Sequence, residues 1–350
     1  MVVGCAVLLW SAILATVSAV QFPMIPARSR GDGIRLVLQV HVEDAVRRKL
    51  SQDLQQLRFD LTKLAIPYMA LLLQPSWSNP ATILITGVPP DRHAAFRRLT
   101  LDVLGPNFLI QSDPGRQNAF TMQLLPTAVT RLKNRALQQS IQVISNRMRQ
   151  LGIAGARVQR YGQGAGEILV QLPPLNDPGR VKMIIQAVGW LQINLVMGGP
   201  YPSRQAAVAA HRGVLPPGTE LIPYNTPSAG VAGVRTWYMV SQAAPVTWRD
   251  LSEADVGKDE HGHPSVHFTL TNNGAVRLAR LKEANMGKKL AIILDNSVVT
   301  VSAIQSQGSG QGTISGFLTP REATDLAIVL RSGALPASIS YLEESVGGSR

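Results

Sequence analysis

The 350-residue chain contains little of several residue types that define particular structural classes. Cys5 is the only cysteine, which excludes a fold held together by internal disulfide bonds. Aromatic residues make up 5% and charged residues 16%, but hydrophobic residues reach 45%, so the chain is too apolar for wholesale disorder. Only one long apolar run occurs, which excludes a protein with several apolar membrane spans. A chain of this length can bury two or three domain cores.

Acidic residues are scarce relative to basic ones, and the imbalance lies in one part of the chain. The formal net charge is +12. Residues 28–160 hold 19 Lys and Arg against 8 Asp and Glu, whereas residues 161–350 hold 15 against 14. A basic stretch beside an apolar segment suits anionic lipid head groups as well as it suits nucleic acid. Charge alone therefore leaves a lipid surface, nucleic acid and simple solubility open.

The N-terminal segment contains no Lys, Arg, Asp or Glu before residue 28. Its apolar run from Val2 to Phe22 is long enough to span a hydrocarbon layer as one helix. A cleaved signal peptide is the alternative, because residues 17–19 offer the small-residue pattern of a cleavage site. We expect residues 1–26 to form a transmembrane anchor or a signal segment.

Residues 27–197 alternate between strand and helix patterns. The strands are predicted at 34–40, 81–86, 120–124, around 158, at 168–172 and at 191–195. The helices are predicted over 43–64, 90–104 and 137–151, and from Asn176 onward. The helix ending near Gly152 has the clearest pattern, because one apolar stripe runs along it at spacings of three and four. This order of elements predicts α+β layers of the ferredoxin-like kind.

The sequence pattern of the second half of the chain predicts another domain. Residues 198–235 are rich in glycine, proline and alanine, so we expect a linker or hinge there. Beyond it, strands are predicted at 237–240, 265–269, 290–294, 298–304 and 313–315. Helices are predicted over 273–285 and from Thr319, where Thr-Pro-Arg-Glu forms a capping box with proline at the first helical position.

No pattern of catalytic residues stands out. The glycine-rich loops at 162–166 and 308–312 lie between strands and lack the spacing of phosphate-binding loops, so both are predicted to be turns. Acidic and histidine side chains cluster at Asp259, Glu260, His261, His263 and His267. Because this cluster lacks a recognisable ligand scheme, we expect a solvated hairpin turn rather than a metal site. We expect no enzymatic activity, no cofactor and no bound metal.

Seven motifs occur in the order found in a known protein family. The first runs from Ser140 to Arg147 and is followed by Leu151, Gly152 and Ile153. The most distinctive positions of the second half are Gly262, Pro264, Phe268, Gly287, Asp295, Gly316, Gly333, Leu335 and Pro336. In these motifs the chain resembles the SecD family, the accessory subunits of the bacterial Sec protein-export machinery.

The resemblance implies an architecture and a role. Residues 27–197 would form a ferredoxin-like base, residues 198–334 an inserted, mobile α/β head, and residues 335–350 a strand returning to the base. One N-terminal transmembrane helix would anchor the chain in the bacterial inner membrane, with its bulk in the periplasm. The family binds unfolded preprotein and works with the SecYEG translocon and a SecF-like subunit. The resemblance implies no cofactor and no nucleic acid.

The chain departs from the family pattern at three points. Residues 29–33 keep only a remnant of the glycine-rich motif that follows the first helix of the family, and residues 66–135 do not align. The family continues into five further membrane helices that carry its proton-coupling groups, so we expect this chain to lack proton coupling. A cleaved periplasmic module, a non-functional remnant and, less readily, a nucleic-acid-binding protein stay open as alternatives.

Overall fold

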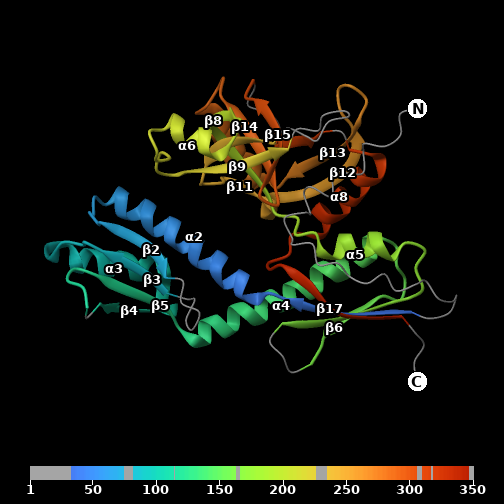
Figure 1. Ribbon diagram of the computed structural model, residues 1–350, viewed down its shortest axis with the longest axis horizontal. Coiled ribbons are helices and arrows are strands. Elements are labelled where there is room, and N and C mark those ends of the chain that lie inside the picture. Colours follow the sequence, from blue (N-terminus) through green and yellow to red (C-terminus); the bar gives the residue numbers. More distant parts are fainter. Residues whose placement is uncertain are drawn as a thin grey trace.

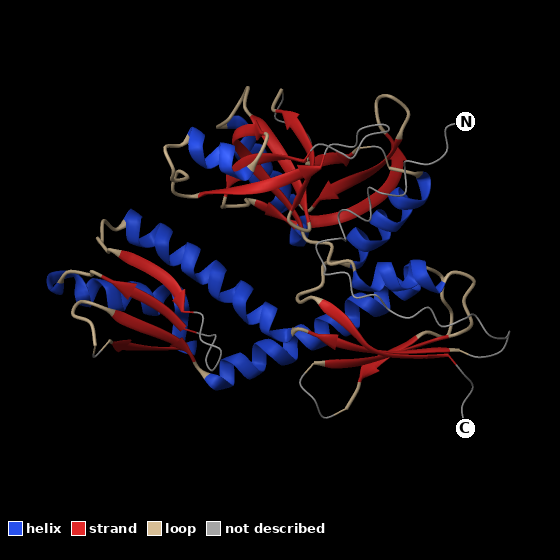
Figure 2. Cartoon of the chain, in the orientation of Figure 1, coloured by secondary structure: helices blue, strands red, loops and turns tan. Residues whose placement is uncertain are grey.

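The computed structural model describes residues 33–74, 82–113, 115–162, 166–225, 235–305, 310–316 and 318–346. The predicted anchor or signal segment, residues 1–26, lies outside this part of the chain. Within the described ranges, no helix is both long enough and apolar enough to cross a membrane. The fold is mixed α+β, as the sequence predicted, and the strands form four separate sheets (Figures 1 and 2).

The first sheet brings the two ends of the described chain together. It is antiparallel and has the order β17-β1-β7-β6. Its strands are β1 (Ile34–Val40), β6 (Arg157–Arg160), β7 (Glu167–Leu172) and β17 (Ile339–Val346). The helices α4 (Pro126–Gln150) and α5 (Pro178–Gln186) pack on it through a shared apolar core that includes Leu36, Ile144, Val170 and Ile185. Alternate residues of β1 enter this core, which is the period of a strand with one buried face.

Between β1 and β6 the chain builds a second α+β unit with its own core. Its antiparallel sheet has the order β2-β3-β5-β4. The elements are α2 (Val42–Lys63), β2 (Ala70–Gln74), β3 (Thr82–Thr86), α3 (His93–Leu104), β4 (Phe108–Ser112) and β5 (Phe120–Leu124). The side chains of Leu57, Ile83, Phe96 and Phe120 meet in its core. Much of the stretch that the sequence left unaligned, residues 66–135, therefore folds as part of this unit.

The remaining elements form the sheets above α2 in Figure 1, which we call the head. A six-stranded sheet has the order β10-β9-β15-β14-β8-β11, and a three-stranded sheet has the order β12-β13-β16. Their strands are β8 (Leu191–Tyr201), β9 (Thr219–Asn225), β10 (Arg235–Ser241), β11 (Val246–Thr247), β12 (Leu251–Lys258), β13 (Pro264–Leu270), β14 (Lys289–Leu294), β15 (Ser297–Ala303) and β16 (Gln311–Ile314). The helices of this part are α6 (Arg204–Ala210), α7 (Asn272–Glu283) and α8 (Pro320–Ser332).

The glycine- and proline-rich stretch 198–235 is structured over its described residues rather than forming the linker that its composition predicted. The strand β8 continues through it to Tyr201, and α6 and β9 follow. The predicted boundary between residues 197 and 198 falls inside β8, because β8 pairs with β14 along its first half and with β10 along its second. Glycine is required here for close packing, since a Cβ at Gly199 would lie 2.8 Å from the carbonyl oxygen of Trp237.

Candidate functional site

The chain crosses between the first sheet and the head twice, and both crossings pass one buried side chain. Arg147, on α4, is completely buried. Its Nη1 donates hydrogen bonds to the carbonyl oxygens of Ile184 at 2.8 Å, Ile185 at 3.0 Å and Ala187. Its Nη2 donates to the carbonyl oxygen of Gly333 at 3.3 Å, on the return crossing. One guanidinium therefore ties the outgoing and the returning segments to α4.

The Arg147 guanidinium suits this position because two of the carbonyl groups that it meets have no N–H partner within their own helix. Ile184 and Ile185 lie in the last turn of α5, where backbone carbonyls have no helical N–H to accept from. A guanidinium offers several donors in a fixed plane and favours the negative end of a helix dipole. Burial lowers the pKa of Arg147 to about 9, and the carboxylate of Asp295 opposes this shift. The side chain is therefore charged at neutral pH.

Asp295 holds the outgoing crossing from the head side. It lies in the turn between β14 and β15, and its carboxylate accepts hydrogen bonds from the backbone N–H of Gly189 at 3.1 Å and of Trp190 at 2.7 Å. Burial raises the pKa of Asp295, while these two amides, Arg147 and Arg48 act in the opposite direction. The turn of the head sheet is thus fixed to the segment that leaves the first sheet.

A third contact reaches this joint from α2. The guanidinium of Arg48 lies 4.8 Å from the centre of the Trp190 ring, a cation–π distance. Its Nη1 also donates to the carbonyl oxygen of Leu335 at 3.4 Å. The Trp190 ring in turn packs 5.9 Å from the ring of Trp248. We call the group of Arg48, Arg147, Trp190 and Asp295 the joint.

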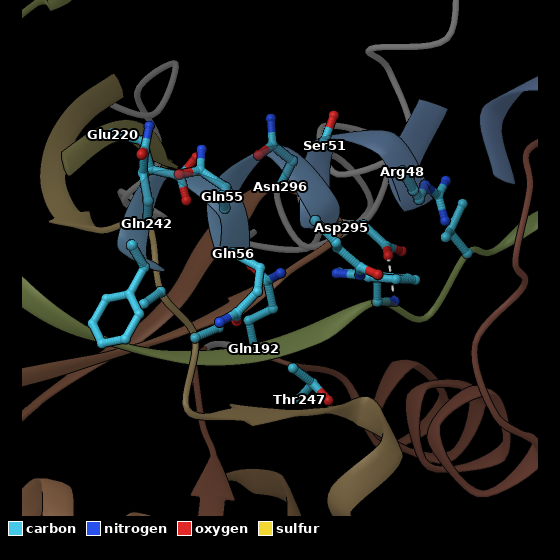
Figure 3. Close-up of a pocket in the computed structure, with 16 residues that line it drawn as sticks. Arg48, Ser51, Gln55, Gln56, Gln192, Glu220, Gln242, Thr247, Asp295 and Asn296 are labelled. Carbon is cyan, nitrogen blue, oxygen red and sulfur yellow. Dashed lines mark hydrogen bonds between the residues drawn. The ribbon is translucent and has the colours of Figure 1, made fainter. Parts of the chain in front are cut away.

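A cleft of about 830 Å³ opens beside the joint, between α2 and the head. Figure 3 shows side chains of α2, including Gln55, facing Gln192, Gln242 and Glu220 of the head. Half of the residues that line it are glutamine, asparagine, serine or threonine. These outnumber the charged residues Arg48, Glu220 and Asp295, and five lining residues, including Phe59 and Trp190, are apolar. Such a surface can exchange hydrogen bonds but offers few opposite charges to an ionic ligand.

The structure brings some of the sequence-predicted positions together and separates the others. Asp295, Gly333 and Leu335 meet at the joint, with Pro336 next along the chain, and the N–H of Leu335 donates to the carbonyl oxygen of Val188 at 2.8 Å. The remaining predicted positions belong to the architecture of the head. Phe268 is buried in its core and Pro264 begins β13, while Gly262, Gly287 and Gly316 adopt positive φ in turns or connections.

Sequence reasoning missed the role of Arg147, although the residue lies in a recognised motif. A signal was available, because Arg147 lies on the same helix face as the apolar residues Ile144 and Leu151. A charged residue on a buried face needs partners inside the protein. The partners themselves, at residues 184–188 and 333, could not be identified from spacing.

Four members of the acidic and histidine cluster, Asp259, Glu260, His261 and His263, lie in a hairpin turn, and the fifth, His267, lies in β13. The turn lies between β12 and β13, and the Oδ1 of Asp259 accepts from the backbone N–H groups of His261 and His263, both at 2.9 Å. Among the described residues, no group of three or more His, Cys, Asp or Glu is placed to hold a metal ion. Asp259 therefore stabilises a turn.

Comparisons with known proteins point to one family. The SecDF P1 head subdomain matches residues 223–337, and the N-terminal part of the SecDF P1 domain matches residues 137–198. The protein translocase subunit SecD of Koribacter versatilis is 37% identical over 316 residues, which are 90% of this chain and 58% of that protein. That of Aquifex aeolicus is 28% identical over 336 residues, 96% of this chain and 62% of that protein.

A solved structure supports the same fold. The crystal structure of SecDF in its super-membrane-facing form aligns with 97% of this chain and 34% of its own, with a TM-score of 0.51 and 21% identity. The chain spans about three fifths of the length of the two curated relatives described above.

Proposed function

Because the chain belongs to the SecD family of protein translocase subunits, we propose that it assists Sec-dependent export by binding unfolded preprotein. The role is one of binding and handling rather than of catalysis. The binding takes place on the periplasmic side of the bacterial inner membrane. The partners are the SecYEG translocon and a SecF-like subunit, with residues 1–26 as the single-pass anchor.

The base of this protein is ferredoxin-like in our proposal. Its strands in chain order are β1, β6, β7 and β17, so the sheet order β17-β1-β7-β6 corresponds to 4-1-3-2. Helices lie between the first and second strands and between the third and fourth, which is the split βαβ arrangement. The unit from α2 to β5 is then one insertion, and the head, from β8 to α8, is a second that begins a few residues before the predicted range 198–334.

One observation carries the binding role: the cleft beside the joint lies between parts of the chain that have separate cores. The core around Phe96 is distinct from the cores of the head. The chain passes between the base and the head twice at Arg147, and α8 of the head also packs on α4 and α5 through an apolar cluster and the ion pairs Arg180–Asp325 and Arg321–Asp177. A cleft between separately folded parts is a common place for a ligand, because their relative motion can open and close it.

Fluorescence anisotropy tests the proposal. The full chain, kept in a mild detergent because residues 1–26 are apolar, is titrated into a labelled, reduced and carboxymethylated model protein that cannot fold. Saturable binding is expected for the unfolded form, and none for the same protein in its folded form. Absence of binding at low salt contradicts the proposed function. Mass spectrometry of the mature N-terminus separates an anchored chain from a cleaved one, because an intact Met1 excludes cleavage.

A further inference from the structure

We propose that the cleft between α2 and the head binds an extended, uncharged polypeptide segment through its main chain. The inference rests on the proposed preprotein-binding function and assigns it a place and a mode of recognition. It makes binding independent of which uncharged side chains the bound segment carries.

One wall of the cleft is a stripe along α2. It consists of residues at helical spacing, namely Arg48, Ser51, Gln52, Gln55, Gln56 and Phe59. The opposite face of α2 is buried through Leu50, Leu57 and Leu61. An exposed helix face usually carries charged residues, but the middle of this stripe is serine and glutamine. The stripe is about 16 Å long at the rise of a helix, which matches about five residues of extended chain.

The facing wall carries amides of the head. Gln192 lies on β8, Gln242 follows β10, and Asn296 lies in the turn between β14 and β15. The Oε1 of Gln242 is buried and has no hydrogen-bond partner within the described chain. A buried acceptor without a donor costs free energy, which an incoming N–H group would relieve. Gln242 is therefore prepared for a ligand that donates hydrogen bonds.

The lining favours a peptide backbone because its chemistry resembles that of the backbone. A side-chain amide offers both a donor and an acceptor, as each peptide group does. Amides on both walls can pair with the alternating N–H and C=O groups of an extended chain, whatever its sequence. Two of the charged groups are already engaged, since Arg48 stacks on Trp190 and Asp295 accepts from backbone amides. The opposite charges of Arg48 and Asp295 offset each other, and burial raises the pKa of the third group, Glu220.

An oligosaccharide fits the same lining less well. Sugar sites present an aromatic face on which a pyranose ring can stack. Here the Trp190 ring is covered by the guanidinium of Arg48 and packs against Trp248. Phe59, with 64% of its surface exposed, is left at one end of the stripe to give an apolar contact.

The test uses the full chain and a labelled ten-residue peptide of Ser, Thr, Val and Gly with both ends capped. Its counterpart, N-methylated at alternate residues, has half of the main-chain donors removed. We expect the peptide to bind, and the methylated form to bind about tenfold more weakly because several hydrogen bonds are lost. The double variant Q52A/Q55A and the variant Q242L are each expected to weaken binding by a similar factor. The matched control Q138A/Q139A, which changes two exposed glutamines of α4 outside the cleft, should bind as the wild type does.

The outcomes separate this inference from the proposed function. If Q52A/Q55A and Q242L bind the unfolded model protein as tightly as the wild type does, the cleft assignment is wrong and the preprotein-binding function stands. If the wild type binds no unfolded protein, both fail. Equal affinity for the methylated and unmethylated peptides overturns main-chain recognition. Binding of an oligosaccharide in place of the peptide, abolished in Q52A/Q55A, would assign the cleft to sugars and overturn the inference. Circular dichroism of each variant confirms that it is folded.

Discussion

Because Arg147 holds both crossings between base and head, we predict that Arg147→Met strongly destabilises the connection between these two parts. Methionine has a similar length and keeps the apolar packing of a buried position, but it has no hydrogen-bond donor. The substitution therefore removes the charge and leaves the carbonyl groups of Ile184, Ile185, Ala187 and Gly333 without the donor that they share.

The expected magnitude follows from these contacts. Removing one partner of a buried hydrogen bond to a charged group costs about 1–3 kcal/mol, because the remaining polar group stays desolvated. Four carbonyls share one guanidinium, so the costs overlap, and we expect about 3–5 kcal/mol for Arg147→Met. Arg147→Lys keeps a charge but offers a single ammonium, and should recover only part of this loss. A loss of this size is a large fraction of the stability of an ordinary domain.

Amide hydrogen exchange measures the effect at the joint itself. The N–H groups of Gly189, Trp190 and Leu335 are all hydrogen-bonded at the crossings. In Arg147→Met they should exchange about 10²–10⁴-fold faster, as the free-energy change dictates. Arg149→Met is the control, because Arg149 is exposed on the same helix. If the two variants exchange alike at these amides, the guanidinium does not hold the joint and the reasoning is refuted.

Three further predictions test other features of the structure. Burial raises the pKa of Glu220, so ionisation of this carboxyl group destabilises the fold. The free energy of unfolding of the wild type should therefore fall relative to that of E220Q as pH rises through the folded-state pKa. Urea unfolding at several pH values measures this difference, which should not change with pH below pH ~4.5. Thr319→Ala removes the side chain of the α8 capping box and should lower the free energy of unfolding by about 1 kcal/mol; an unchanged urea midpoint would contradict it. Gly189→Ala should lower the thermal unfolding temperature more than Gly155→Ala does. Both glycines have positive φ, but only at Gly189 would an added Cβ lie 2.8 Å from Val329. Equal decreases in the two variants would contradict the packing argument.

Local patterns predicted most elements of secondary structure. The apolar stripe of Leu137 to Leu151 marked the C-terminal half of α4, and the Thr-Pro-Arg-Glu sequence marked the start of α8 with its capping box. These signals lie within one helix, so no distant contact is needed to interpret them. The strand β2 was missed because its Ala-Leu-Leu-Leu-Gln sequence shows no alternation and lies among prolines.

Amino-acid composition predicted a linker at a place where glycine instead allows close packing. Residues 198–201 resemble a linker, yet they continue β8, because the strand needs small residues where Trp237 and Tyr201 approach its backbone. Glycine frequency in a sequence does not distinguish a flexible link from a crowded strand, since both favour the absence of a Cβ.

The sequence by itself determined most of the elements, the mixed α+β class and the motif order that indicates the SecD family. The joint and the cleft were decided by the tertiary structure alone. Arg147, Asp295 and Leu335 are separated by up to 188 positions, and they meet only because β17 returns to pair with β1 after the head is complete. The glutamines of α2 likewise look like an ordinary solvated face until the head is placed opposite them. Helix and strand periodicity describes which residues share a face, whereas the partner of that face depends on the path of the whole chain.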